Sequence, residues 1–92
     1  MKVQNMISPR TGRSVPNQFV VCHEGCRYFQ SYATLIVCIN ENGSVVLDPR
    51  WDCSVTTSKW RARFLGESTA ETRRKISSGE YIVTSLSMEK IK

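Results

Sequence analysis

The chain has 92 residues, with 13 Lys or Arg against 8 Asp or Glu, so its formal net charge is +5. An apolar fraction of 40% with 23% charged residues is typical of one small folded domain and argues against a disordered chain. No apolar run approaches the roughly 20 residues of a membrane-spanning helix, and the N-terminus lacks the apolar core of a secretory signal. We therefore expect a cytoplasmic protein whose cysteines are reduced or bound to metal.

The N-terminal segment, residues 1–16, shows no hydrophobic periodicity and contains two prolines and a glycine. We expect a flexible basic arm there, which carries Arg10 and Arg13. Such an arm can reach a phosphate backbone, although most arms of this kind are only frayed ends. A single domain is predicted over residues 17–86, followed by a polar tail at residues 87–92.

From residue 17 the sequence has the pattern of β-strands and tight turns. Four strands are predicted, at residues 19–21, 27–32, 35–40 and 44–47. The third is almost wholly apolar, so it should be central in the sheet. Gly25 is expected to supply a positive φ in the first turn, and Asn42-Gly43 favours a tight hairpin before the last strand. These features together predict a four-stranded antiparallel meander.

The spacing becomes helical after the fourth strand. Trp60 and Phe64 lie four residues apart, which places them on one face of a helix. Gly66 is a typical helix stop. Three residues are alternative N-caps for this helix, and the sequence does not choose among Asp52, Ser54 and Thr56.

A second helix and a last strand follow. Ser68 and Glu71 have the spacing of a capping box, which predicts a helix that ends before Gly79. Residues 80–86 alternate again and are predicted to return to the sheet as a fifth strand. The expected fold class is α+β: an antiparallel sheet of about five strands, made of a meander of four, two short helices and a last strand, in one small domain.

Cysteines supply the candidate metal ligands, namely Cys22, Cys26, Cys38 and Cys53. A meander should bring the third strand back towards the first turn, which would place Cys38 near Cys22 and Cys26. Cys53 must fold back to join them, so His23 is an alternative fourth ligand. Four such ligands would make a closed, structural zinc site with no position for a substrate. The alternative is that Cys38 is an apolar core residue and the other thiols are incidental.

No complete catalytic motif is found, and we predict that the protein is not an enzyme. Cys22 and His23 are adjacent on a strand, so they point to opposite faces and cannot easily act as nucleophile and base. Cys26 could reach His23, but no third group orients the imidazole. Asp48 and Asp52 are separated by a proline that prevents a shared helical face, which argues against acid–base work by this pair.

Basic residues gather in the second half of the chain and are the candidate partner-binding set: Arg50, Lys59, Arg61, Arg63, Arg73, Arg74 and Lys75. If the two helices lie side by side, these residues would form one positive patch for a phosphate backbone or an acidic protein surface. The alternative is that they form ordinary solvated faces. Tyr28, Tyr32 and Trp51 could stack on bases, but no single-strand-binding motif surrounds them, and both tryptophans are expected in the core.

Several longer runs carry a family resemblance: NQF at 17–19, YFQSY at 28–32, LD and WD within 47–52, SVTTSKWR at 54–61, FLGE at 64–67 and ETRRKISSGEYI at 71–82. They resemble a family of small proteins without assigned activity that are encoded by bacteriophages and prophages of Gram-positive and gut bacteria. Cys53 and Trp60 depart from that pattern, and Cys22, Cys26 and Cys38 are not part of it. The resemblance implies phage origin and the cytoplasm of a bacterial host, and it carries over no catalytic residue.

These observations leave two hypotheses for function. The first is a non-catalytic phage protein that binds a host or defence protein stoichiometrically and inhibits it, for example an anti-CRISPR-type inhibitor of a CRISPR effector nucleoprotein. A basic inhibitor would not mimic DNA, so it would bind through an acidic or apolar surface of its target. The second is a basic accessory protein that binds nucleic acid. Zinc is the one cofactor considered, no membrane partner is expected, and the sequence leaves the oligomeric state open.

Overall fold

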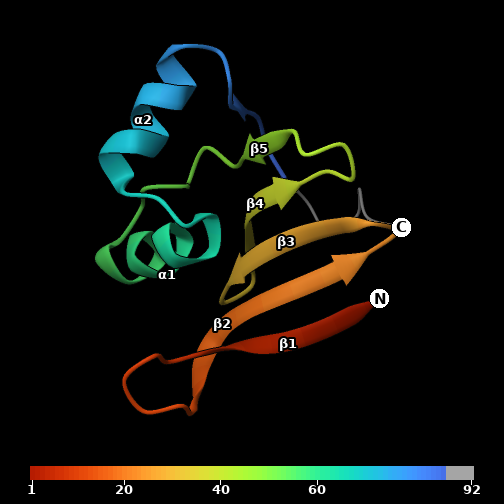
Figure 1. Cartoon of the computed structure of the whole chain (residues 1–92), viewed down its shortest axis with the longest axis vertical. Coiled ribbons are helices and arrows are strands. Elements are labelled where there is room, and N and C mark those ends of the chain that lie inside the picture. The colour runs from red at the N-terminus through yellow and green to blue at the C-terminus, as the bar shows by residue number, and fades with distance from the viewer. Residues whose placement is uncertain (87–92) are drawn as a thin grey trace.

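The sheet in the computed structural model has six strands, which lie side by side in chain order, with two helices on one of its faces (Figure 1). Residues 1–86 are the part of the chain that the structure describes. The elements are β1 (Lys2–Ile7), β2 (Ser14–His23), β3 (Cys26–Ser31), β4 (Thr34–Ile39), β5 (Val45–Leu47), α1 (Val55–Leu65), α2 (Thr69–Ser77) and β6 (Ile82–Val83). Neighbours from β1 to β5 are antiparallel, and β6 is parallel to β5. The predicted α+β class is confirmed.

Two-residue turns connect β2 to β3 and β3 to β4. Glu24 and Gly25 both have a positive φ, of 50° and 80°, as a two-residue hairpin of the favoured twist requires. Tyr32, in the turn between β3 and β4, also has a positive φ, of 55°. Its N–H donates to the Asn17 carbonyl at 2.7 Å, and its own carbonyl accepts from Nε2 of Gln30 at 2.7 Å. A bulky residue in this conformation costs about 1 kcal/mol or more, so these bonds hold a strained turn in place.

Local capping sets the ends of both helices. Of the three predicted caps for α1, the structure selects Ser54, whose hydroxyl accepts the Thr57 N–H at 3.1 Å. Gly66 ends α1 in the left-handed conformation with a φ of 72°. Ser68 caps α2 as predicted and accepts the Glu71 N–H at 3.1 Å. The two helices are therefore bounded by the residues that the sequence indicated.

The hydrophobic core lies between the sheet and the helices. Its buried members are Met6, Phe29, Ile36, Val37, Val45, Leu47, Trp60 and Tyr81. Phe29 on β3 stacks on Phe64 of α1, with ring centroids 5.8 Å apart. Trp60 is buried in this core, and Trp51 packs against it half-buried. The core thus joins the strands to the helical layer, which fixes where α1 lies over the sheet.

The N-terminal segment is part of the sheet, so the flexible arm predicted over residues 1–16 is wrong: residues 14–16 belong to β2, and residues 2–7 form a strand of their own. These residues form β1, which pairs with β2 from Lys2 opposite Cys22 to Ile7 opposite Ser14. Every residue of β1 except Met6 is exposed. An edge strand with a single buried side chain has no apolar alternation, and therefore the sequence pattern did not reveal it.

The C-terminal end of the sheet also differs from the expectation. The last strand is limited to Ile82–Val83 and runs parallel to β5, whereas the alternation predicted a longer strand over residues 80–86 in an antiparallel sheet. The connection through α1 and α2 is a crossover that returns the chain to the end of the sheet where β5 begins, so that β6 runs in the same direction as β5. The predicted tail at residues 87–92 lies outside the described residues.

Replacement of Met6 by Ala tests whether β1 belongs to the folded core. We expect the free energy of unfolding to fall by about 2 kcal/mol, because Met6 packs with Trp60 and Phe29 in the same core cluster. Chemical denaturation followed by circular dichroism measures this change. The exposed neighbour Ile7 is the matched control, and Ile7→Ala should change the value by less than about 0.5 kcal/mol. Equal, negligible effects of both substitutions would mean that β1 is a frayed arm.

Candidate functional site

Ion pairing divides the seven predicted partner-binding residues into two groups. Five of them contact carboxylates within the protein, in the pairs Arg50–Asp48, Arg61–Asp52, Arg73–Asp52, Arg74–Glu71 and Lys75–Glu67. Lys59 and Arg63, both on α1, form no ion pair within residues 1–86. The single positive patch expected along both helices is therefore not what the structure presents, because carboxylates neutralise much of it.

Arg61 is buried, and its prediction as a partner-binding residue is wrong. Its side chain has an exposed fraction of 0%. Nη1 donates to the Trp51 carbonyl at 3.0 Å, Nη2 donates to the Thr69 hydroxyl, and the guanidinium lies 4.8 Å from the centre of the Trp51 ring. Burial lowers the pKa of Arg61, with Asp52 acting in the opposite direction, yet a guanidinium stays protonated in proteins. Arg61 therefore joins α1 to the preceding loop and to the start of α2.

Lys75 is likewise used inside the protein. The carboxylate of Glu67 accepts hydrogen bonds from the Thr72 hydroxyl at 2.6 Å, from Nζ of Lys75 at 3.0 Å and from the Tyr81 hydroxyl at 2.6 Å. Burial raises the pKa of Glu67, but the hydrogen bonds from Thr72, Tyr81 and Lys75 outweigh it, so the net pKa is below its ordinary value. This cluster fastens α2 to the segment that leads into β6.

Glu67→Gln is expected to lower the free energy of unfolding at pH 7 by about 2 kcal/mol, because bonds to a charged acceptor are lost. The pKa of Glu67 is lower in the folded chain, so the stabilisation is present above the unfolded pKa of about 4.3 and is lost as the pH falls through the folded pKa. Denaturation of both proteins from pH 7 to pH 3 measures the difference, which should shrink below about pH 4.3. A difference that is constant over this range would contradict the role of the charge.

A cleft of about 250 Å³ lies between α1 and the loop that joins β1 to β2. The loop contributes Ser8, Pro9 and Arg10, and α1 contributes Lys59, Trp60 and Arg63. Three of these six lining residues are cations, and no carboxylate lines the cleft. Pairing of β1 with β2 positions the loop, and the burial of Trp60 fixes the side of α1 that faces it. Two segments far apart in the sequence thus make one positively charged recess.

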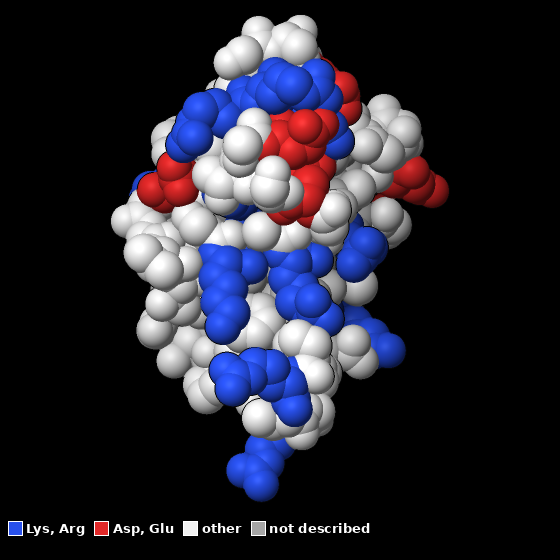
Figure 2. Space-filling model, turned by 60° about the vertical axis from the view of Figure 1, so that its left-hand side comes forward, with Lys and Arg blue, Asp and Glu red and all other residues white. Residues whose placement is uncertain are grey.

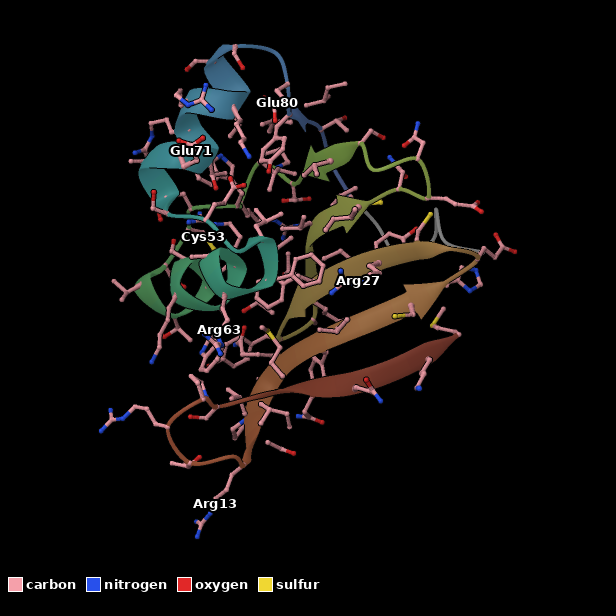
Figure 3. The ribbon with its side chains drawn as sticks, viewed as in Figure 1. Arg13, Arg27, Cys53, Arg63, Glu71 and Glu80 are labelled. Atoms are coloured by element: carbon pink, nitrogen blue, oxygen red, sulfur yellow. The ribbon has the colours of Figure 1, made fainter. Side chains whose placement is uncertain are left out.

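We call Arg10, Arg13, Lys59 and Arg63 the basic face. None of the four forms an ion pair within the described part of the chain. Figure 2 shows blue side chains at the level of α1 and of the loop below it without red among them, whereas red atoms lie higher on the molecule. Figure 3 shows Arg63 beneath α1 and Arg13 at the far end of the loop. Such a single-sign surface creates a positive potential that attracts polyanions.

Lys59 is held at the cleft by an aromatic contact. Its Nζ lies 5.1 Å from the centre of the Trp60 ring, within the range of a cation–π interaction. Arg27 is a further cation without an ion pair within residues 1–86, but it lies over the Phe64 ring at 5.1 Å, away from Arg13 in Figure 3. Lys59 is therefore partly preorganised before any ligand binds.

A wider hollow of about 570 Å³ lies at the N-terminal end of α1. Asp52 and Lys59 both line it, together with the exposed Cys53 and Val55. Because its charges are of both signs, this hollow does not extend the basic face. It is shallow, and it shares only Lys59 with the cleft.

The predicted metal ligands are only partly brought together. Sγ of Cys38 lies 3.4 Å and Sγ of Cys26 lies 3.9 Å from Oδ1 of Asn40, so these two thiols are neighbours. His23 pairs with Cys26 across the hairpin, whereas Cys22 points to the opposite face of β2. Cys53 is exposed in the loop before α1. Within residues 1–86 no three His, Cys, Asp or Glu side chains are placed to hold a metal ion, so a zinc site stays a prediction without support here.

The thiol pair sits in an environment that favours neutral groups. Burial raises the pKa of the Cys38 thiol, with a smaller lowering effect from the Tyr28 hydroxyl. Burial, with contributions from Cys38 and Cys26, raises the pKa of Tyr28 to about 12. At neutral pH the Cys38 thiol is therefore protonated, which suits a packing role for this residue.

Sequence reasoning missed half of the basic face. Arg10 and Arg13 were considered only as parts of a flexible arm, and the residues that line the cleft with Arg10, Lys59 and Arg63, follow about 50 residues later in the sequence. The missing signal was the pairing of β1 with β2, which carries the loop to α1. Exposed cations that flank a proline and a glycine do indicate a surface loop, but not the element that it approaches.

Comparisons with known proteins give a family and no activity. No helix within residues 1–86 is long and apolar enough to cross a membrane. No curated protein and no solved structure matches the chain. A family model matches residues 1–80, from β1 to the end of the segment after α2. On that match, the chain belongs to DUF8033, a family of unknown function.

Proposed function

We propose that this protein is a non-catalytic binding protein whose basic face contacts the phosphate backbone of a nucleic acid. The observation that carries the proposal is the basic face itself: four cations without an ion pair within residues 1–86, three of them around one cleft. Arg and Lys at such positions release counterions from a phosphate backbone, which is the main source of affinity in nucleic-acid binding.

The division between paired and unpaired cations supports this choice. Arg73 and Arg74 on α2 already contact Asp52 and Glu71, so a phosphate would have to compete with a carboxylate. Lys59 and Arg63 have no such competitor within residues 1–86. A polyanion therefore gains the most electrostatic attraction on the basic face, because its phosphates need not displace carboxylates from the cations there.

A non-catalytic role is supported by the state of the reactive groups. The thiol of Cys38 is buried and its pKa is raised, which disfavours the nucleophilic thiolate. Asp48 is bound to Arg50 at 3.0 Å, and its second oxygen accepts the Leu86 N–H at 2.9 Å, so it has a structural partner at both oxygens. The cleft is lined by three cations and an indole, with Ser8 and Pro9 beside them, and this set suits binding.

The affinity for nucleic acid is expected to fall steeply with salt. Four phosphate contacts predict a slope of log K against log salt concentration between about −3 and −4. Fluorescence anisotropy with labelled oligonucleotides of mixed sequence gives this slope. The salt concentration is varied from about 25 to about 200 mM, over which the Debye length changes about threefold. Absence of binding to single-stranded and double-stranded DNA and RNA at the lowest salt would refute the proposal.

A second candidate is inhibition of a host or defence protein by a phage-encoded protein in the bacterial cytoplasm, as the sequence resemblance implies. One feature favours it. β1 is an edge strand, and Val3 and Ile7 on it are exposed. No strand within residues 1–86 pairs with the outer side of β1, and such an edge can accept a partner's strand. Under this second candidate function, the inhibited partner would be a protein such as a CRISPR effector.

Affinity purification from infected host cells, with and without nuclease, separates the two candidates. Inhibition through β1 would be favoured if one host or defence protein were recovered in an equimolar ratio to this protein. Its recovery should be unchanged by nuclease and lost in a Val3→Pro variant. A Val3→Lys variant, which keeps the backbone N–H, should still bind through strand pairing. Recovery of nucleic acid, or of proteins that disappear with nuclease, would favour the basic face.

A further inference from the structure

We infer that the ligand of the basic face is single-stranded nucleic acid, with one backbone phosphate in the cleft and a base stacked on Tyr32. The inference rests on the proposed nucleic-acid function and adds the state of the strand. It joins two features that are independent of each other: the shape of the cleft, and an exposed tyrosine at a strained turn that is hydrogen-bonded to α1.

The cleft is a recess and not a flat surface. Its walls are the loop at Ser8–Arg10 on one side and one face of α1 on the other, and it encloses about 250 Å³. A duplex is stiff over about 150 base pairs and presents its phosphates along a rod. A single strand is flexible and can turn one phosphate into a recess. Arg10, Lys59 and Arg63 would meet that phosphate from both walls.

Tyr32 provides the second contact. Its side chain is exposed, with a fraction of 58%, although its backbone is fixed by hydrogen bonds to Asn17 and Gln30. A strained backbone at an exposed position is a reason to look for function there. An accessible aromatic ring beside cations is the arrangement that binds single strands without sequence preference, because every base has a face that can stack.

Tyr32 lies in a turn that is joined to α1, the helix that forms one wall of the cleft. Ser31 precedes Tyr32, and the Ser31 and Thr57 hydroxyls are hydrogen-bonded at 3.0 Å, which joins the β3–β4 turn to α1. Thr57 lies about one helical turn, roughly 5 Å along the axis, before Trp60, which lines the cleft. Because both contacts depend on α1, a phosphate and a neighbouring base of one strand can reach them together.

An acidic protein segment is the main competing ligand. Its carboxylates could pair with the cleft cations, but it would leave the ring of Tyr32 without a stacking partner. The two ligands therefore differ in whether Tyr32 contributes to binding. Glutamate peptides of matched charge and length are the probe for this alternative.

The direct test uses the two indole N–H signals of the protein in NMR spectra. Trp60 lines the cleft, whereas Trp51 is covered by Arg61 and Arg73. Titration with a 12-residue single-stranded oligonucleotide at low salt should shift the Trp60 signal and leave that of Trp51 in place. The same oligonucleotide as a duplex should bind about tenfold more weakly, because its bases cannot stack on the ring.

Matched variants assign the contacts. Tyr32→Asn removes the ring and keeps a residue that tolerates a positive φ, so the turn should be retained. It should weaken single-strand binding about tenfold, with no change for the duplex, and Tyr32→Trp should restore binding.

Arg10→Gln and Arg13→Gln remove the same charge from the same loop, but only Arg10 lines the cleft. Arg10→Gln should therefore weaken binding more.

Three results would overturn the inference: duplex binding as tight as single-strand binding, a Trp60 signal that does not move, or glutamate peptides that shift it equally. Equal effects of Arg10→Gln and Arg13→Gln would also exclude the cleft. If any of these results is found while DNA or RNA still binds, the proposed function stands and only the inference fails. Absence of all nucleic-acid binding would remove both.

Discussion

Arg61→Ala is expected to lower the free energy of unfolding by about 3 kcal/mol. The side chain is fully buried and holds three elements together, through the Trp51 carbonyl, the Thr69 hydroxyl and the Trp51 ring. Alanine would leave that carbonyl without its donor and open a cavity beneath the indole. Urea denaturation measures the loss, with the helical circular dichroism signal at about 222 nm as the probe of unfolding.

Two further variants separate charge from packing at this position. Neither Arg61→Met nor Arg61→Ala buries a charge, but Met fills most of the volume, so it should lose less stability than Ala because the cavity is smaller. Arg61→Lys keeps the charge but cannot bond two acceptors in the planar fork, and it should lose about 2 kcal/mol. If Arg61→Ala changed stability by less than about 0.5 kcal/mol, Arg61 would behave as a surface residue, as the sequence had suggested.

Phe29→Ala is expected to have the largest effect, a loss of about 4 kcal/mol. Phe29 has an exposed fraction of 0%, lies on β3 in the middle of the sheet, and stacks on Phe64 of α1. Removal of the ring takes away both sheet packing and the contact that holds α1. Because a domain of this size has a total stability of about 5–10 kcal/mol, the variant should be partly unfolded at 37 °C.

The matched control for Phe29 is its stacking partner. Phe64 is half-buried, so Phe64→Ala removes the same ring contact with less apolar burial and should lose about 2 kcal/mol. A double variant should lose less than the sum of the two, since the stacking interaction is counted in both. Additive losses would mean that the rings pack independently of each other.

Local signals explain which parts of the fold were predictable. The turn at Glu24-Gly25, the cap at Ser68 and the stop at Gly66 each depend on a few neighbouring residues, and all were identified. β1 was not, because its pairing with β2 joins residues up to about 20 positions apart and only Met6 is buried. Edge strands depend on a partner and not on their own pattern.

The burial of Arg61 could have been predicted. Thr57, Trp60, Arg61 and Phe64 follow the spacing i, i+3, i+4 and i+7, which defines one face of a helix. Three of them are buried and Phe64 is half-buried. Arg61 was nevertheless predicted to be exposed because of its residue type, since arginine is seldom buried without partners. Its partners, Trp51 and Thr69, come from a loop and from the next helix, which no local pattern joins to α1.

The basic face was predictable only in part. Lys59 and Arg63 are one turn apart on a helix, so they share a side, and both belonged to the predicted partner-binding set. The contribution of Arg10 depends on the β1–β2 pairing, and the removal of Arg73, Arg74 and Lys75 from the patch depends on ion pairs with particular carboxylates. Net charge therefore favoured the class of ligand that we propose, and only the structure shows which cations have no carboxylate partner among the described residues.

The most direct test of the central claim compares the salt dependence of nucleic-acid binding in two variants with the same net charge. Arg63→Gln removes a cation of the basic face, and Arg74→Gln removes a cation that is already paired with Glu71. We predict that Arg63→Gln makes the slope of log K against log salt shallower by about 1, while Arg74→Gln leaves it unchanged. Equal changes in slope for the two variants would contradict the account, because binding would then follow net charge and not the basic face.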